Sequence, residues 1–177
     1  RALHGGSETG LGDEILADGV QIAAGGQVHH RVGPVADRPS QLGQFAGQVG
    51  TLARMADYEV IGHGHPRIMA RLAIWYGKKG IEVVRSFEEV CRRADLYVND
   101  ASSTLFEFAS TDRPVVVLNP NFYRRGINHG LRFWEASHVG IGVSPTDSLV
   151  FAVKKALADS PAQRVARESA LDLVYRY

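Results

Sequence analysis

The chain has 177 residues, a length that suits one domain with a substantial buried core. Its 20 basic and 19 acidic side chains leave a formal net charge of +1 at pH 7, which argues against nucleic acid or an anionic membrane surface as a partner. No stretch approaches the roughly 20 apolar residues of a membrane helix, and the N-terminus lacks the pattern of a signal peptide. We therefore expect a soluble, cytoplasmic chain that binds anions only at a local site.

Residues 1–56 form a glycine-rich segment whose fold the sequence does not specify. Eleven of the 19 glycines lie within the first 50 residues, and the apolar positions there follow neither the helical nor the strand period. Short pieces still suggest structure: residues 19–23 have the composition of a strand, and residues 41–55 are compatible with a helix. Each glycine inside that helix would weaken it by about 1 kcal/mol relative to alanine.

Residues 57–177 have a different character, because short apolar runs alternate with segments of helical period. The predicted strands are 58–62, 81–84, 96–98, 114–118 and 139–143. The predicted helices are 66–75, 87–93, 105–110, 146–159 and 161–175. Near-continuous apolar runs such as 114–118 are typical of strands buried on both faces of a parallel sheet. The pattern predicts an α/β domain with a Rossmann-like, doubly wound parallel sheet.

Ligands of such sheets bind beyond the carboxyl ends of the strands, so the loops that follow the strands are the places to search. After the third strand of this domain, residues 100–104 read Asp-Ala-Ser-Ser-Thr and lead directly into a helix. Free backbone N–H groups and the hydroxyls of Ser102, Ser103 and Thr104 would suit a diphosphate. Glu107, one turn further on, could accept hydrogen bonds from a ribose. The alternative is that Asp100 or Ser102 only caps the helix.

Two other loops contain further candidates. Residues 62–67 include His63 and His65, which could donate to phosphate or act as an acid or base near neutral pH. Two histidines without a third ligand nearby support a zinc site only weakly, and we predict no metal. The loop 119–132 is long and rich in donors, which is typical of a functional loop. Its Arg124, Arg125, His129 and Arg132 could clamp phosphate.

The only cysteine, Cys91, lies in the predicted helix 87–93 and has no partner for a disulfide or a cysteine-based zinc site. A lone cysteine of this kind usually packs as a small apolar side chain. We therefore predict a buried, unreactive thiol.

Residues 94–109, which read ADLYVNDASSTLFEFA, together with Arg-Pro-Val-Val at 113–116, resemble the CDP-glycerol glycerophosphotransferase family. The resemblance covers about residues 58–177 and departs from the family at Ala101, where the family often has an aromatic residue. It implies the C-terminal, donor-binding half of a GT-B architecture. It further implies that Ser102, Ser103 and Thr104 hold the donor diphosphate and that Glu107 faces the ribose. His65 and His129 would lie close to the phosphates, and we predict them as the catalytic residues.

The leading hypothesis for function follows from these residues and from the resemblance together. It is a transferase that moves a sugar or glycerophosphate group from a nucleotide-diphosphate donor to a cell-envelope polymer, such as a teichoic-acid-like glycan, with no cofactor and no metal. The chain would then be a donor-binding fragment, attached to the inner face of the membrane, if at all, through a missing N-terminal acceptor domain.

Two other functions remain open. One is an enzyme like the UDP-N-acetylglucosamine 2-epimerases, whose binding turn has two glycines where this chain has Ser103 and Thr104. The other is a catalytically silent nucleotide-binding module. Product analysis with UDP-N-acetylglucosamine would separate the first from a transferase. Donor binding that depends on Ser102 and Ser103, without turnover even when an acceptor domain is supplied, would identify the second.

Overall fold

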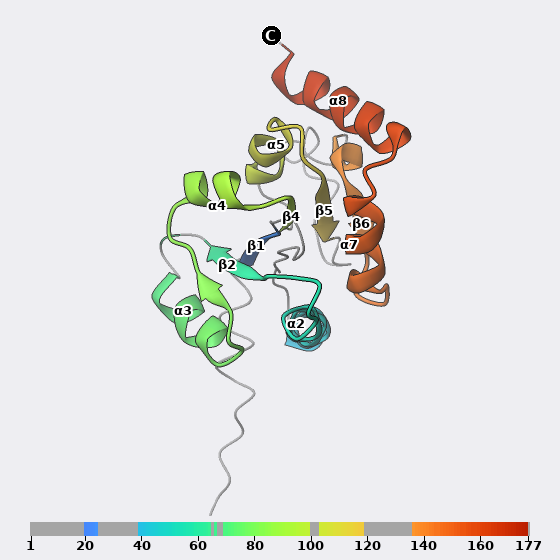
Figure 1. Ribbon diagram of the computed structural model, residues 1–177. Helices are drawn as coiled ribbons and strands as arrows, with labels where there is room; N and C mark the ends of the chain where they lie inside the picture. Colours follow the sequence, from blue (N-terminus) through green and yellow to red (C-terminus); the bar gives the residue numbers. More distant parts are fainter. Residues whose placement is uncertain are drawn as a thin grey trace, which may run out of the picture.

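The structure is a computed structural model that describes residues 20–24, 39–64, 66, 69–99, 103–118 and 136–176. It is a mixed α/β fold in which helices lie around a central sheet (Figure 1). The strands are β1 (Val20–Ala24), β2 (Ile61–Gly64), β3 (Glu82–Val83), β4 (Leu96–Asn99), β5 (Val115–Leu118) and β6 (Ile141–Val143). The helices are α2 (Pro39–Leu52), α3 (Met69–Gly77), α4 (Phe87–Arg93), α5 (Thr104–Ala109), the short 3-10 helix η2 (Ser137–Val139), α7 (Leu149–Leu157) and α8 (Pro161–Tyr175).

The strands form one sheet in the order β3-β2-β1-β4-β5-β6. Pairing is parallel between β2 and β3, between β4 and β5, and between β5 and β6. The parallel sheet was predicted for residues 57–177, and the strand pairings described within that range are parallel. Strand β1 lies before that range and is antiparallel to both of its neighbours, β2 and β4. The backbone of a strand can form hydrogen bonds in either direction. The composition of residues 19–23 therefore did not reveal the direction of β1.

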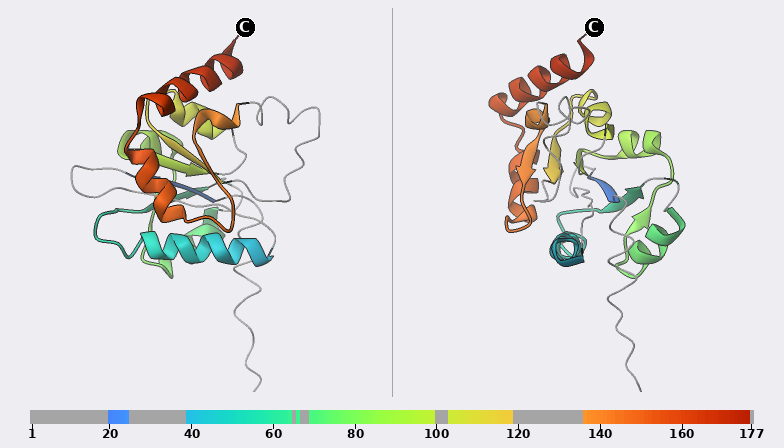
Figure 2. Two further views of the ribbon diagram at one scale, coloured as in Figure 1. Left: turned by 90° about the vertical axis from the view of Figure 1, so that its right-hand side faces the viewer. Right: turned by 180° about the vertical axis from the view of Figure 1, so that it is seen from behind.

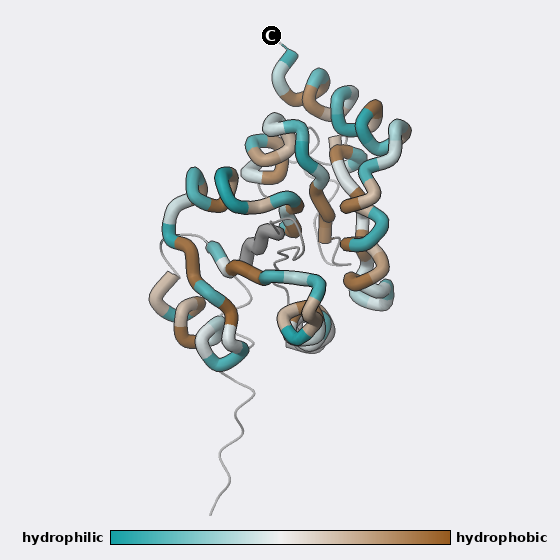
Figure 3. The backbone as a smooth tube through the Cα atoms, viewed as in Figure 1, coloured by the Kyte–Doolittle hydropathy of each residue, from teal (hydrophilic) through white to brown (hydrophobic). Residues whose placement is uncertain are grey.

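Two apolar cores lie on opposite faces of the sheet. Alternate residues of β4 divide between them: Leu96 and Val98 pack into one core, and Tyr97 packs into the other. The first core is closed by α2, α3 and α7, and the second by α4, α5 and α8, as the side view of Figure 2 shows. Every residue of β4 and β5 is buried, which confirms the prediction of strands covered on both faces. In Figure 3 the hydrophobic β5 lies among helices of mixed hydropathy.

The elements predicted in the glycine-rich segment are both present, as β1 and α2. Helix α2 contributes the fully buried Phe45, Val49 and Leu52 to the first core. Its Gln48 also holds the start of α7, because Gln48 Oε1 accepts from the backbone N–H of Leu149 at 2.6 Å and Gln48 Nε2 donates to the carbonyl of Asp147 at 3.1 Å. The domain boundary placed after residue 56 stays a prediction; it marks a change in composition.

Two predicted strands begin two or more residues later than expected. The chain at Tyr58 is still in a turn, since its N–H bonds to the carbonyl of Met55, and β2 begins at Ile61. The strand expected from Val139 begins at Ile141, because η2 occupies residues 137–139. The end of β2 matters for function, because it lies at Gly64 and not at the expected Gly62, which places His63 inside the strand and not in the loop that follows.

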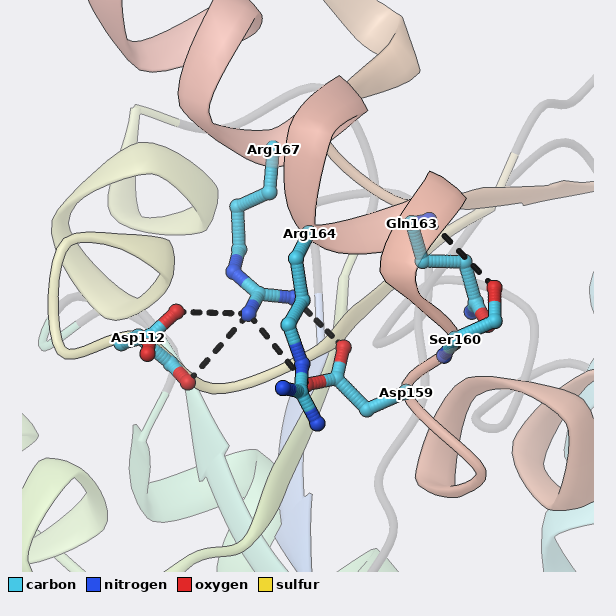
Figure 4. Close-up of polar contacts among 6 residues, drawn as sticks. All are labelled: Asp112, Asp159, Ser160, Gln163, Arg164 and Arg167. Carbon is cyan, nitrogen blue, oxygen red and sulfur yellow. Dashed lines mark hydrogen bonds and ion pairs between the residues drawn. The ribbon is translucent and has the colours of Figure 1, made fainter.

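Helix α8 is attached to the rest of the fold through a buried arginine. Arg167 is only 2% exposed, and it binds Asp159 Oδ1 at 2.8 Å and Asp112 Oδ1 at 2.7 Å (Figure 4). Burial alone would raise the pKa of Asp159, but hydrogen bonds from Arg167 and Arg164 lower it below its usual value. Both aspartates have a left-handed backbone, with φ of 57° at Asp112 and 39° at Asp159. Aspartate tolerates this conformation better than most residues do.

Candidate functional site

The carboxyl ends of β2 and β4 lie on the same edge of the sheet, on either side of β1. From this point the chain continues outward in opposite directions, to β3 on one side and to β5 and β6 on the other. Open α/β sheets bind ligands at such a switch point. Strand β2 ends at Gly64 and β4 at Asn99, so the ends of both strands carry residues that had been predicted for the loops 62–67 and 99–104. This edge is the candidate site.

Ser103 and Glu107 lie exposed on the first turn of α5, directly after this edge. Ser103 occupies the N-cap position, but its side chain makes no capping hydrogen bond. Its hydroxyl instead lies 3.4 Å from Glu107 Oε1, at the limit of a hydrogen bond. Since α5 has only six residues, its dipole is short, and the side chains must provide most of the interaction with a ligand.

Thr104, the third hydroxyl residue of the predicted motif, is held within the protein. Its Oγ1 accepts from Asn99 Nδ2 at 2.9 Å and lies 3.1 Å from the hydroxyl of Tyr97. Asn99 Nδ2 also lies 3.3 Å from that tyrosine hydroxyl, and both Asn99 and Tyr97 are fully buried. This pair was not predicted from the sequence, although an asparagine at the end of an apolar strand was the available signal. The network ties the end of β4 to the first turn of α5.

Replacing Thr104 with valine is expected to lower the free energy of unfolding by about 1–2 kcal/mol. The change keeps the shape but removes an oxygen from a buried polar network, so the amide of Asn99 loses its shorter contact. Denaturant titration measures the loss. Thr104→Ser, which keeps the hydroxyl, is the control, and an equal loss in both variants would show that the methyl group is what matters.

His63 is buried, with 7% of its surface exposed, in the second-last position of β2. Its Nδ1 lies 2.8 Å from the carbonyl of Val84, and the hydroxyl of Tyr76 donates to the backbone carbonyl of His63 at 3.1 Å. Burial lowers the pKa of the imidazole, and the bond to Val84 only partly offsets this. The ring is therefore neutral at pH 7.

The other predicted site residues lie outside the described part of the chain. These are His65, Ser102, Arg124, Arg125, His129 and Arg132. Their assignment to the diphosphate or to catalysis stays a prediction, as does the role of Asp100.

Cys91 is half-buried in α4, and burial raises the pKa of its thiol, which agrees with an unreactive cysteine. Among the described residues, no group of three histidine, cysteine or acidic side chains is arranged to hold a metal. Within the same residues, no helix has the length and hydropathy needed to span a bilayer.

A cavity of about 250 Å³ lies at the opposite side of the sheet, at the amino ends of β5 and β6. It is lined by the starts of β5 and β6, through Val115 and Ile141, and by Gln163 and Ala166 of α8. Because ligands of parallel sheets bind at the carboxyl edge, this cavity is not part of the candidate site, even though it is well formed.

Comparison with known families gave one match over most of the chain. A family model described as CDP-Glycerol:Poly(glycerophosphate) glycerophosphotransferase matches residues 50–177. The matched region runs from the last turn of α2 through α8 and includes both ends of the candidate site. Searches of curated proteins and of solved structures gave no match.

Proposed function

The chain belongs to the CDP-glycerol:poly(glycerophosphate) glycerophosphotransferase family, and we propose that it binds the nucleotide-diphosphate donor of a glycerophosphate or sugar transfer at the carboxyl edge of β2 and β4. Family membership supports a transferase of the glycerophosphotransferase type with a nucleotide-linked donor and a polymer acceptor. The finer proposal is a metal-independent reaction by the donor-binding half of a GT-B enzyme, with a cell-envelope glycan as acceptor.

One observation carries the assignment of the site within the chain. The hydroxyl of Ser103 is exposed at the start of α5, is not used as a helix cap, and lies beside the carboxylate of Glu107. A hydroxyl can donate to a phosphate oxygen, whereas a carboxylate repels phosphate and accepts from sugar hydroxyls. We therefore assign Ser103, together with Ser102, to the diphosphate, and Glu107 to the ribose.

Transfer of this kind requires positioning of the donor and neutralisation of the charge that develops on the leaving nucleotide. In our proposal the hydroxyls orient the diphosphate, and Arg124, Arg125, His65 and His129 supply positive charge and hydrogen-bond donors. The group that activates the acceptor would lie on a second domain. The isolated chain would then bind donor but transfer it slowly.

Alanine at Ser103 or at Glu107 is expected to weaken donor binding about tenfold each, the effect of losing a hydrogen bond worth about 1.4 kcal/mol. Calorimetric titration of the chain with CDP-glycerol, with and without magnesium, measures both the loss and the metal requirement. Equal affinity in the presence of a chelator is the expected result for a metal-independent site.

Ser110→Ala is the matched control, because Ser110 lies at the other end of α5 and its hydroxyl donates to the carbonyl of Glu107 at 2.7 Å. It should bind donor as the unmodified chain does. Equal loss in all three variants would mean that α5 has been disturbed as a whole. If a folded chain binds UDP-N-acetylglucosamine but not CDP-glycerol, the donor assignment is wrong.

A further inference from the structure

The hydrogen bond of His63 determines which of its ring nitrogens carries the proton. A carbonyl oxygen only accepts, so the contact of 2.8 Å with Val84 requires a hydrogen on Nδ1. The neutral ring then has an unprotonated Nε2, which can only accept. The bond to Val84 also fixes the plane of the ring, because β2 and the chain after β3 are held together by the bond from the N–H of Val84 to the carbonyl of Gly62 at 2.8 Å.

Nε2 has no hydrogen-bond partner among the described residues, although His63 is buried, with only 7% of the residue exposed. A buried acceptor without a donor costs about 1–3 kcal/mol, so native proteins seldom keep one without a purpose. The hydrogen-bond donor that Nε2 lacks must be an O–H or N–H group. A phosphate oxygen cannot serve, because it too is an acceptor.

The ring lies in a row of aromatic side chains that leads to the candidate site. The centroid of His63 is 6.0 Å from that of Phe87, and the centroid of Phe87 is 5.7 Å from that of Tyr97. The hydroxyl of Tyr97 in turn contacts Thr104, the first residue of α5. His63 thus belongs to the same face of the sheet as the network at the end of β4, and to the same edge as Gly64.

We propose that Nε2 of His63 accepts a hydrogen bond from a hydroxyl group of the nucleotide-linked donor, and so forms a hydroxyl-binding subsite at the carboxyl end of β2. This inference rests on the proposed function, since it requires that the donor binds at this edge. The hydroxyl belongs either to the ribose or to the transferred glycerol. In both cases the subsite distinguishes a hydroxyl from a phosphate oxygen.

His63→Asn separates the subsite from the structural role of the ring. The amide nitrogen of asparagine takes the position of Nδ1 and can still donate to Val84, but nothing replaces Nε2. His63→Gln does the reverse, since its amide oxygen reaches the position of Nε2 while the bond to Val84 is lost. Thermal unfolding of both variants, followed by circular dichroism, reports the structural bond independently of any ligand.

Calorimetric titration at pH 7.5 with CDP-glycerol, CDP and inorganic pyrophosphate tests the inference. We expect His63→Asn to unfold at the temperature of the unmodified chain and to bind CDP-glycerol about tenfold more weakly, while His63→Gln is less stable but binds more tightly than His63→Asn. Pyrophosphate, which has no alcohol hydroxyl, should bind equally to all three proteins. A loss confined to CDP-glycerol assigns the hydroxyl to glycerol, and an equal loss for CDP assigns it to the ribose.

The inference is overturned if folded His63→Asn binds CDP-glycerol as tightly as the unmodified chain does, or if it loses pyrophosphate binding to the same extent. The proposed function fails separately, and the inference with it, if the unmodified chain binds neither nucleotide.

Discussion

Replacing Asp159 with glycine is expected to lower the free energy of unfolding by about 3 kcal/mol. The change leaves the guanidinium of Arg167, which is 2% exposed, without its more buried carboxylate, and breaking one side of a buried ion pair costs about 3–5 kcal/mol. We expect the lower end of that range, because Asp112 still binds the same guanidinium. Glycine adopts the φ of 39° at this position without strain, so the loss reports the charge. Urea denaturation measures it.

Asp112→Gly provides the matched control, since Asp112 also has a positive φ and also binds Arg167. Its side chain is 82% exposed, compared with 19% for Asp159, and we expect a loss of about 1 kcal/mol or less. Adding Arg167→Met to Asp159→Gly should recover much of the stability, because the double variant has no buried unpaired charge. If the double variant is less stable than Asp159→Gly, packing and not charge holds α8 in place.

Replacing Gly140 with alanine is expected to cost about 2–3 kcal/mol. A Cβ atom there would lie 2.2 Å from the carbonyl oxygen of Val115 and 2.5 Å from its Cγ2. The first of these atoms is backbone in β5, so a side-chain rotation cannot relieve the clash, and the chain before β6 must move away. The midpoint of thermal unfolding should fall accordingly.

Gly142→Ala is the control for this prediction. Gly142 lies two residues further on, in β6, and an added Cβ would meet no atom within 4 Å. We expect no loss, and a gain of up to about 1 kcal/mol is consistent with the reduced entropy of the unfolded chain. Similar losses at both positions would indicate that β6 tolerates no side chain for a reason other than the contact with Val115.

Much of the fold was predictable where local signals agree with one another. Helix α8 begins and ends where expected, because Ser160 and Gln163 form a capping box, Pro161 occupies the first turn, and the apolar positions keep the helical period. Strand β5 was predicted from its run of branched apolar residues. Helix α4 also has a clear local signal at its start, because the side chain of Ser86 accepts from the N–H of Glu89.

The candidate site was predictable only in part. The hydroxyl run and Glu107 were predicted as site residues because they follow a strand that reads clearly as buried, and their role stays a prediction. His63 was expected in a loop because β2 was predicted to end two residues too early, at Gly62 and not at Gly64, and Asn99 was assigned to the loop after β4 without a role of its own. In both cases the polar residue lies in the last two positions of a short strand, where boundaries depend on pairing with strands that are distant in sequence.

By itself, the sequence determined the α/β alternation, the elements with clear caps and periods, the strands buried on both faces, and the family to which the chain belongs. These features depend on residues that are close together in the chain. The tertiary structure decided the antiparallel direction of β1, the pairing of Arg167 with two aspartates from separate turns, the use of Thr104 within the protein, and the tautomer of His63. Each of these depends on contacts between residues far apart in the chain, and no local pattern encodes such contacts.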